Sequence, residues 1–426
     1  MRFNRNRLKL NILFLMIFSF VLFGSFLFIQ KVYSLQFIES DHFQDQALSY
    51  RERVEVLEAK RGTIYDKHFN VLASSIQSYN VAIKPNEIND LGFIKVLSPI
   101  LGIDENKIIN KITENSNFFY LKRNVDFDTG QKIKSWNYKG IHLEQSNKRN
   151  VYDESTANLI GLVDPDGNGI EGLELYFDNY LQGQNGELRY ESAPNGAIIP
   201  QGEIKTIQPK HGEDLVLSID SELQYLTENL CNDALVDTGA FKCSVVFANS
   251  LTGEVLISSE TSSLDNKYFN IDLISARAYY EPGSALKIFT IGSLIESDIV
   301  DENSSYLVED EIEIIDGSCD DNHEGFKGCF KDFLKHEPLN LTVEEIIERS
   351  SNGGTIKIVN NSNIDNVEEF LKKFGFGSRT GVELSGESKG SFTEYNTCKT
   401  CLSSLSIGYL SLIHIPSPRD LQGSRM

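Results

Sequence analysis

Ser284 and Lys287 stand three residues apart, directly behind Pro282 and Gly283, at the start of the apolar stretch ALKIFTIGSLI. A serine hydroxyl is a weak nucleophile until a neighbouring base removes its proton, and on a helix a lysine three residues further along lies on the same face. To act as that base, the amine needs a pKa lowered from about 10.4 toward 7, through burial and the positive charge of Arg277. The four residues therefore predict either an activated nucleophile or an ordinary helix start.

A second polar group, Ser350-Ser351-Asn352, interrupts the apolar pattern of LTVEEIIERSSNGGTIKIV, which otherwise predicts two helices. The Ser350 hydroxyl could relay a proton, and the Asn352 carboxamide could orient a substrate amide. Serine and asparagine are also favoured helix caps, so the triplet taken alone predicts a cap.

Length and composition limit the class of protein. The chain has 426 residues, 40% of them hydrophobic, which is enough for two or three globular domains. Its formal net charge of −21 argues against a nucleic-acid-binding protein, which needs a cationic surface for phosphate contacts. Patterns for a strand, a helix, two strands and a helix follow one another between residues 214 and 296. They predict an α+β fold class in which helices pack on an antiparallel sheet.

The amino-terminal stretch predicts a membrane anchor. Residues 1–9 carry Arg2, Arg5, Arg7 and Lys9, and no charged residue follows before Lys31. The apolar stretch 10–30 would rise about 30 Å as a helix, enough to span a bilayer. The leading cations predict a cytoplasmic amino terminus and export of the rest of the chain. A cleaved signal peptide is the alternative, but the length of the apolar run favours an uncleaved anchor.

Several segments after the anchor have clear local patterns. Residues 31–56 predict a polar helical stem, and 60–75 predict a hairpin. Residues 214–220 predict a strand, followed by a helix with Asp220 or Ser221 as its cap. Residues 243–260 predict two strands around a Thr-Gly turn.

Cys319 and Cys329 bracket the stretch CDDNHEGFKGC. In an exported chain disulfides are permitted, and one between these two cysteines could staple this loop, although the sequence does not decide their pairing. A zinc site that adds His323 and His336 is the alternative, although the spacing matches no standard ligand pattern.

The motifs YEPGSALK and SSN, in this order, resemble the Ser-x-x-Lys and Ser-x-Asn motifs of the penicillin-binding proteins. RGTIYDKHFNVLAS is similar to the hairpin near the start of their non-catalytic domain, with His68-Phe69 in place of the usual Asn-Gly turn. NLIGLVDPDGNGIEGLELYFDNYLQGQNGE resembles the segment that joins the pedestal in class B members, in its division-type form. GEDLVLSIDSELQYL, FANSLTGEVLI and FGFGSRTGVELSGESKG are similar to successive pieces of their transpeptidase domain.

The resemblance implies a role for each matched residue. Ser284 matches the acylated nucleophile and Lys287 its general base. Ser350 matches the hydroxyl that relays a proton to the leaving group, and Asn352 the amide that holds the acyl-donor peptide. The implied reaction is D,D-transpeptidation, in which the serine attacks the D-Ala-D-Ala bond of one stem peptide and an amine of a neighbouring stem resolves the acyl-enzyme. β-Lactams would acylate the same serine, and no metal or organic cofactor is implied.

The resemblance also implies a domain order and a location. We expect a cytoplasmic end (1–9), a transmembrane anchor (10–30), a stem and non-catalytic pedestal domain of the dimerisation type (31–205), a transpeptidase domain (206–409) and a non-native tail (410–426). The protein would cross the bacterial inner membrane once, with its bulk in the periplasm. Expected partners are peptidoglycan stem peptides, β-lactams, a polytopic septal glycosyltransferase and other division proteins.

The family's third motif, Lys-Thr-Gly or Lys-Ser-Gly, does not occur in the 426 residues. In the family it lines the cleft, binds the substrate carboxylate and helps to form the oxyanion hole. We therefore expect a chain that stops short of this motif and is inactive or nearly so, because loss of an oxyanion donor alone costs about 10²–10³ in rate. The alternatives are a D,D-carboxypeptidase, a β-lactam sensor and a non-catalytic cell-division scaffold.

Overall fold

The computed structural model describes residues 2–40, 51–115, 117–193, 197–199, 204–262, 274–277, 280–319, 328–360, 364–390 and 399–409. The chain divides into two compact units. Unit 1 comprises Met1–Gly62, Gln77–Asn147 and Tyr180–Glu213, and unit 2 comprises Thr63–Ile76, Lys148–Asn179 and Asp214–Met426. All four predicted site residues belong to unit 2.

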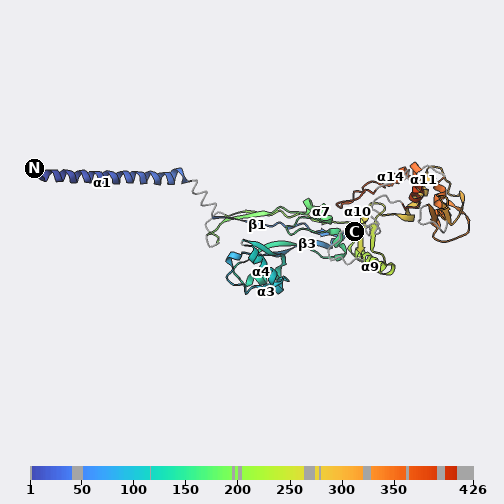
Figure 1. The fold of residues 1–426 in the computed structure, drawn as a ribbon, viewed down its shortest axis with the longest axis horizontal. Helices are drawn as coiled ribbons and strands as arrows, with labels where there is room; N and C mark the ends of the chain where they lie inside the picture. Colours follow the sequence, from blue (N-terminus) through green and yellow to red (C-terminus); the bar gives the residue numbers. More distant parts are fainter. Residues whose placement is uncertain are drawn as a thin grey trace. The chain divides into compact units, whose positions relative to one another are not determined.

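Unit 1 begins with the long apolar helix α1 (Arg2–Tyr33), which continues as the π-helical turn η1 (Ser34–Ile38) (Figure 1). The stretch Ile12–Ile38 has a mean hydropathy of 2.8, and none of it is buried. Among the described residues, this is the one helix that is long and apolar enough to cross a membrane. It contains most of the predicted anchor.

The predicted helical stem is wrong where the structure describes its second half. Glu52–Leu57 form the strand β1, which pairs antiparallel with β6 (Gly186–Glu191), and β6 pairs antiparallel with β7 (Ile204–Ile207). The stretch Arg-Val-Glu-Val alternates polar and β-branched residues, a pattern that favours a strand once a partner strand is available. Residues 41–50 of the stem lie outside the described residues.

The rest of unit 1 is a small α+β core. Its other elements are β3 (Val71–Ile83) from Gln77 on, η2 (Pro85–Glu87), α3 (Ile94–Leu101), α4 (Glu105–Glu114), β4 (Phe119–Asp126), α5 (Phe127–Ser135) and β5 (Ile141–Val151) as far as Asn147. β3 pairs antiparallel with β4, and the helices bury apolar side chains against this pair. The buried set includes Val81, Phe93, Leu97, Ile108, Leu121 and Ile133.

The predicted hairpin at 60–75 is confirmed in unit 2. β2 (Ile64–Tyr65) pairs antiparallel with the first residues of β3 and in parallel with β8 (Leu215–Val216). Within the turn, the Asp66 carboxylate accepts hydrogen bonds from the backbone amides of His68 and Asn70, each with an N–O distance of 2.8 Å. Phe69 has a φ of 63°, so this turn forms without the usual glycine.

The capped helix and the strand pair predicted after residue 214 are also confirmed. α9 (Ser221–Thr238) has Asp220 as its cap, with the carboxylate accepting the Leu223 amide at 3.2 Å. β9 (Lys242–Ala248) and β10 (Val255–Ser262) form an antiparallel pair. A disulfide between Cys231 and Cys243 joins α9 to β9. Short elements precede this group: η3 (Glu154–Thr156), α6 (Ala157–Ile160), α7 (Gly172–Tyr176) and α8 (Asp178–Leu181).

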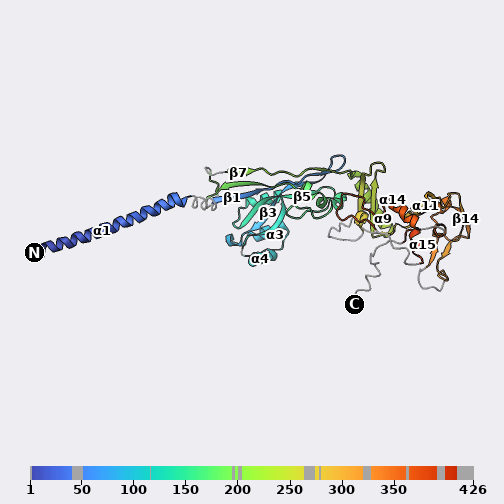
Figure 2. The same ribbon diagram turned by 90° about the horizontal axis from the view of Figure 1, so that it is seen from above.

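The remainder of unit 2 is a helical cluster with short antiparallel strand pairs (Figure 2). Its elements are α10 (Ile274–Arg277), η4 (Gly283–Leu286), α11 (Lys287–Glu296), β11 (Ser305–Val308), β12 (Glu311–Glu313), β13 (Cys329–Lys331), β14 (Leu339–Thr342), α12 (Val343–Glu348), α13 (Asn352–Val359), α14 (Ile364–Lys373) and α15 (Cys401–Ser406). β11 pairs with β14 and β12 with β13. One buried core includes Leu286, Ile291, Leu294, Val308, Ile346, Ile358, Leu371 and Leu405. The predicted α+β class is confirmed, and the core packs α11 and α13 together.

Candidate active site

Ser284 lies on the 3₁₀ turn η4, which runs directly into α11. The amide of Lys287 donates to the carbonyl of Ser284 and closes this turn. Side chains three residues apart eclipse one another in a 3₁₀ turn, so the lysine stem starts on the same side as the serine hydroxyl. Ser284 is exposed, as an attacking hydroxyl must be.

Gly408, just beyond α15, supports the turn from the other side. The amide of Gly283 donates to the Gly408 carbonyl at 3.1 Å. Gly408 has a φ of 79°, and a Cβ added there would lie 2.0 Å from the Gly283 carbonyl oxygen. Only a glycine therefore permits this backbone contact. The sequence had not pointed to this residue, since one glycine after a helix predicts no more than a helix end.

The Lys287 side chain joins the two polar motifs. Lys287 is only 2% exposed. The amine donates to the carbonyl of Ser350 at 2.5 Å and to the Ser350 hydroxyl at 3.2 Å. Ser350 has a φ of 53°, which is uncommon for a residue other than glycine and turns both oxygens toward the amine. The fold thus brings together two motifs that lie 63 residues apart.

Burial lowers the pKa of the Lys287 amine to about 8, while the negative charge of Asp332 acts in the opposite direction. This lowering of the pKa has the direction expected from the sequence. The positive charge of Arg277 is not among its causes: the Arg277 guanidinium donates to the Ser385 carbonyl at 2.9 Å and pairs with Glu171 at 3.3 Å. Desolvation is therefore the physical cause of the shift.

Asn352 is the first residue of α13, and Ser351 is its cap, accepting the Gly354 amide at 2.9 Å. The cap interpretation of the triplet is therefore correct for Ser351. The Asn352 side-chain nitrogen donates to the Lys331 carbonyl at 2.7 Å. Because a carbonyl can only accept, this contact fixes the orientation of the amide. Its oxygen is buried and has no hydrogen-bond partner among the described residues.

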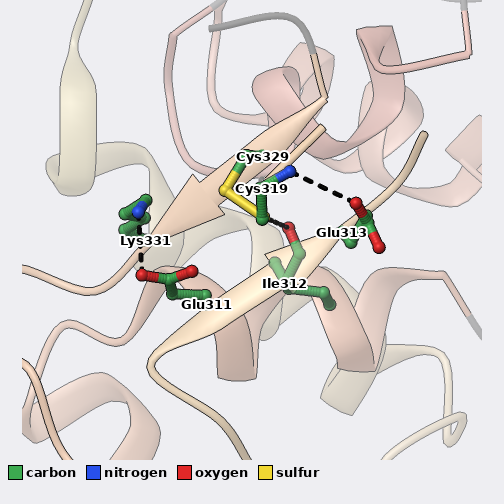
Figure 3. Close-up of a disulfide and its surroundings, with 6 residues drawn as sticks. All are labelled: Glu311, Ile312, Glu313, Cys319, Cys329 and Lys331. Carbon is green, nitrogen blue, oxygen red and sulfur yellow. Dashed lines mark hydrogen bonds and ion pairs between the residues drawn. A yellow bond between two sulfur atoms is a disulfide. The ribbon is translucent and has the colours of Figure 1, made fainter. Parts of the chain in front are cut away.

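A disulfide lies at the β12–β13 pair beside this turn (Figure 3). Cys319 and Cys329 are bonded to each other, which confirms the disulfide interpretation. Neither sulfur is then a free thiolate for zinc, so this alternative is wrong. His323 lies outside the described residues, and His336 contacts the Asp332 carboxylate at 3.3 Å. Lys331 pairs with Glu311 at 2.7 Å across the two strands.

Together these residues can support acyl transfer. An exposed hydroxyl shares a turn with a buried amine of lowered pKa, and that amine contacts a second hydroxyl. A serine nucleophile requires such a base, and a proton that leaves it requires a relay to the departing group. The arrangement suits attack on a carbonyl carbon.

Two family models match the chain. The model of the penicillin-binding protein dimerisation domain matches residues 56–217, and the model of the penicillin binding protein transpeptidase domain matches residues 243–415. A peptidoglycan D,D-transpeptidase FtsI of Buchnera aphidicola is 30% identical over 84% of this chain and 63% of its own length. The protein of the same name from Escherichia coli K12 is 29% identical over 85% of this chain and 62% of its own length.

The chain spans about three fifths of the length of these relatives. Among solved structures, the complex between penicillin-binding protein PBP2 and MreC from Helicobacter pylori matches with a TM-score of 0.66 and 19% identity, over 84% of this chain and 74% of that one. A peptidoglycan synthetase from Bifidobacterium adolescentis matches with a TM-score of 0.58 and 22% identity, over 86% and 71%. At these identities the structures show a shared fold.

Proposed function

Since this chain belongs to the penicillin-binding proteins that join a dimerisation domain to a transpeptidase domain, we propose that it functions as a peptidoglycan D,D-transpeptidase with Ser284 as nucleophile. The observation that carries the proposal is the buried Lys287 amine, which shares a turn with Ser284 and contacts the Ser350 hydroxyl at 3.2 Å. The FtsI relatives support a role at the division septum.

The proposed reaction has two steps. The Ser284 oxygen attacks the carbonyl carbon between the two D-alanines, and the neutral Lys287 amine takes the hydroxyl proton. The C–N bond breaks, Ser350 relays the proton held by Lys287 to the departing amine, and D-alanine leaves. An amine of a second stem peptide then attacks the ester carbonyl, and its proton passes through Lys287 to the serine oxygen as the ester C–O bond breaks, so that the cross-link forms and the serine is restored. The buried Asn352 oxygen is available to accept an N–H of the acyl-donor peptide after a small side-chain movement.

The proposed location and partners follow from the anchor and the relatives. α1 would hold the protein in the bacterial inner membrane, with its cationic end in the cytoplasm and the rest of the chain after α1 in the periplasm. The PBP2 neighbour was solved in complex with MreC. For this protein we propose a polytopic septal glycosyltransferase as partner, met through the anchor helix α1 and the stem that follows it.

The second candidate is a non-catalytic division scaffold, which would need neither an acylated serine nor a base beside it.

The deciding experiment incubates the purified protein with a fluorescent penicillin and, separately, with donor and acceptor stem peptides. Slow covalent labelling together with a cross-linked product supports the transpeptidase. Release of D-alanine without a cross-link indicates a carboxypeptidase, and labelling without turnover indicates a sensor. No labelling after long incubation indicates the scaffold. Sequencing the source gene beyond the codon for Tyr409 shows whether a strand with the third motif follows.

The labelling rate is expected to rise with pH through a midpoint near 8. The Lys287 pKa is lowered to about 8 by burial, so at lower pH most of the amine is protonated and cannot take the serine proton. Below the midpoint, each further decrease of one pH unit reduces the neutral fraction of the Lys287 amine about ten-fold. Initial labelling rates between about pH 6 and pH 9 test this expectation. A flat profile over that range would contradict the assignment of this lysine as the base.

A further inference from the structure

Asp332, directly after β13, is a residue of the site that the sequence did not reveal. Its side chain is 8% exposed, and its carboxylate accepts three hydrogen bonds from the turn that begins α13. The donors are the Ser351 hydroxyl at 2.6 Å, the Asn352 amide at 2.5 Å and the Gly353 amide at 3.0 Å. A negative charge here also interacts favourably with the positive end of the α13 dipole.

The turn held by Asp332 carries the partner of the Lys287 amine. Ser350 immediately precedes the bound residues, and its φ of 53° is a conformation that persists only where the surroundings over-determine it. In this conformation its carbonyl and hydroxyl oxygens lie 2.5 and 3.2 Å from the amine. Without the Asp332 contacts the turn would be free to relax, and both oxygens would move.

The β12–β13 hairpin in turn fixes Asp332. The Asp332 amide donates to the carbonyl of Asp310, the residue directly before β12, at 2.7 Å. The carbonyl of the preceding residue, Lys331, accepts a hydrogen bond from the side-chain amide nitrogen of Asn352. The disulfide between Cys319 and Cys329 ties the connection after β12 to the first residue of β13. Figure 3 shows this disulfide beside the strand pair that carries Glu311 and Lys331.

We propose that Asp332 is a positioning residue of the acyl-transfer site, whose carboxylate fixes the turn from Ser350 to Gly353 and so places the Ser350 oxygens against the Lys287 amine. The assignment rests on the proposed function, in which this amine is the base. Asp332 acts through the turn and through its charge, and it does not touch the substrate. Its charge also favours the protonated amine and so partly opposes the effect of burial.

Two substitutions separate the geometry of Asp332 from its charge. Asp332→Asn removes the charge and one acceptor oxygen while keeping the shape, and Asp332→Glu keeps the charge but moves it by one methylene. Glu311→Gln is the matched control, because it removes a carboxylate from the same hairpin. The Glu311 carboxylate accepts a hydrogen bond from the Lys331 amine, outside the turn that Asp332 holds. All variants are made in the full chain, and circular dichroism checks their folding.

Two readouts do not depend on activity. Amide hydrogen exchange, followed by mass spectrometry on peptides that cover 350–354, reports how firmly the turn is held. An NMR titration of protein with ¹³C-labelled lysine reports the pKa of Lys287, with Lys287→Met to assign the signal. We expect exchange at the turn to be about ten-fold faster or more in both Asp332 variants, since each loses charge-assisted hydrogen bonds. The Lys287 pKa should fall in Asp332→Asn and stay near the wild-type value in Asp332→Glu.

The outcomes are distinct. Faster exchange with an unchanged Lys287 pKa in Asp332→Asn would leave Asp332 a merely structural residue and overturn the proposal. So would exchange and titration equal to those of Glu311→Gln. If Asp332→Asn does not fold, the proposal stands or falls on the faster exchange expected for Asp332→Glu and on its penicillin labelling.

Penicillin labelling separates this proposal from the proposed function. At about pH 9, where most of the Lys287 amine is neutral in the wild type and in both variants, the limiting acylation rate of both Asp332 variants should fall about ten-fold or more. The penicillin concentration that gives half of that rate should change little. A rate equal to that of the wild type would contradict a positioning role. If the wild type is not labelled at all, the transpeptidase function fails, while exchange and titration still decide whether Asp332 holds the turn and acts on Lys287.

Discussion

Replacing Ser284 with alanine is expected to abolish covalent labelling of the protein by penicillin. Ser284 is exposed on the η4 turn. The side chain of Lys287, whose amine is the proposed base, extends from the residue that ends the same turn. An acyl-enzyme ester at this position needs the Ser284 hydroxyl oxygen. Intact-mass spectrometry after long incubation with benzylpenicillin tests the expectation: the wild type should gain the mass of one penicillin, and Ser284→Ala should gain none.

Ser297→Ala is the matched control for this experiment. Ser297 lies at the end of the same helix, α11, and its hydroxyl donates to the Ser293 carbonyl at 2.8 Å. This variant should be acylated like the wild type. If Ser284→Ala still gains the mass of one penicillin, the acylated residue is another one, and digestion followed by peptide mapping would identify it.

Replacing Gly408 with alanine is expected to slow acylation by about 10²-fold or more, because misplacement of a reacting group by about 1 Å can cost that much. The new Cβ would lie 2.0 Å from the carbonyl oxygen of Gly283, the residue before the nucleophile. This neighbour is backbone and cannot turn aside like a flexible side chain, so the η4 turn itself must move. The rate is measured with fluorescent penicillin, and the melting temperature is followed in parallel.

Gly253→Ala is a close control for the backbone conformation. Gly253 has a φ of 78°, almost that of Gly408, but an added Cβ there meets nothing within 4 Å. Both variants therefore carry the cost of a positive φ, and only Gly408→Ala carries the collision. Equal labelling rates for the two variants would show that the contact between Gly283 and Gly408 does not position the nucleophile.

The sequence by itself determined the features that depend on neighbours along the chain. The spacing of Ser284 and Lys287 places them on one helical turn, whatever packs around it. The cap of α9 at Asp220 and the cap of α13 at Ser351 follow from side chains that accept hydrogen bonds from amides three residues further along. The length and polarity of residues 10–30 predicted the apolar helix in the same way.

Only the tertiary structure decided which distant residues meet. Lys287 and Ser350 are separated by 63 residues, and their contact depends on the packing of α11 against α13. Asp332 has no spacing that relates it to the turn it binds, and Gly408 is recognisable only from the backbone it touches. β1 became a strand, and not the predicted helix, because β6 supplies its hydrogen bonds. In each case the deciding interaction joins segments that only the folded chain brings together, so no local pattern could encode it.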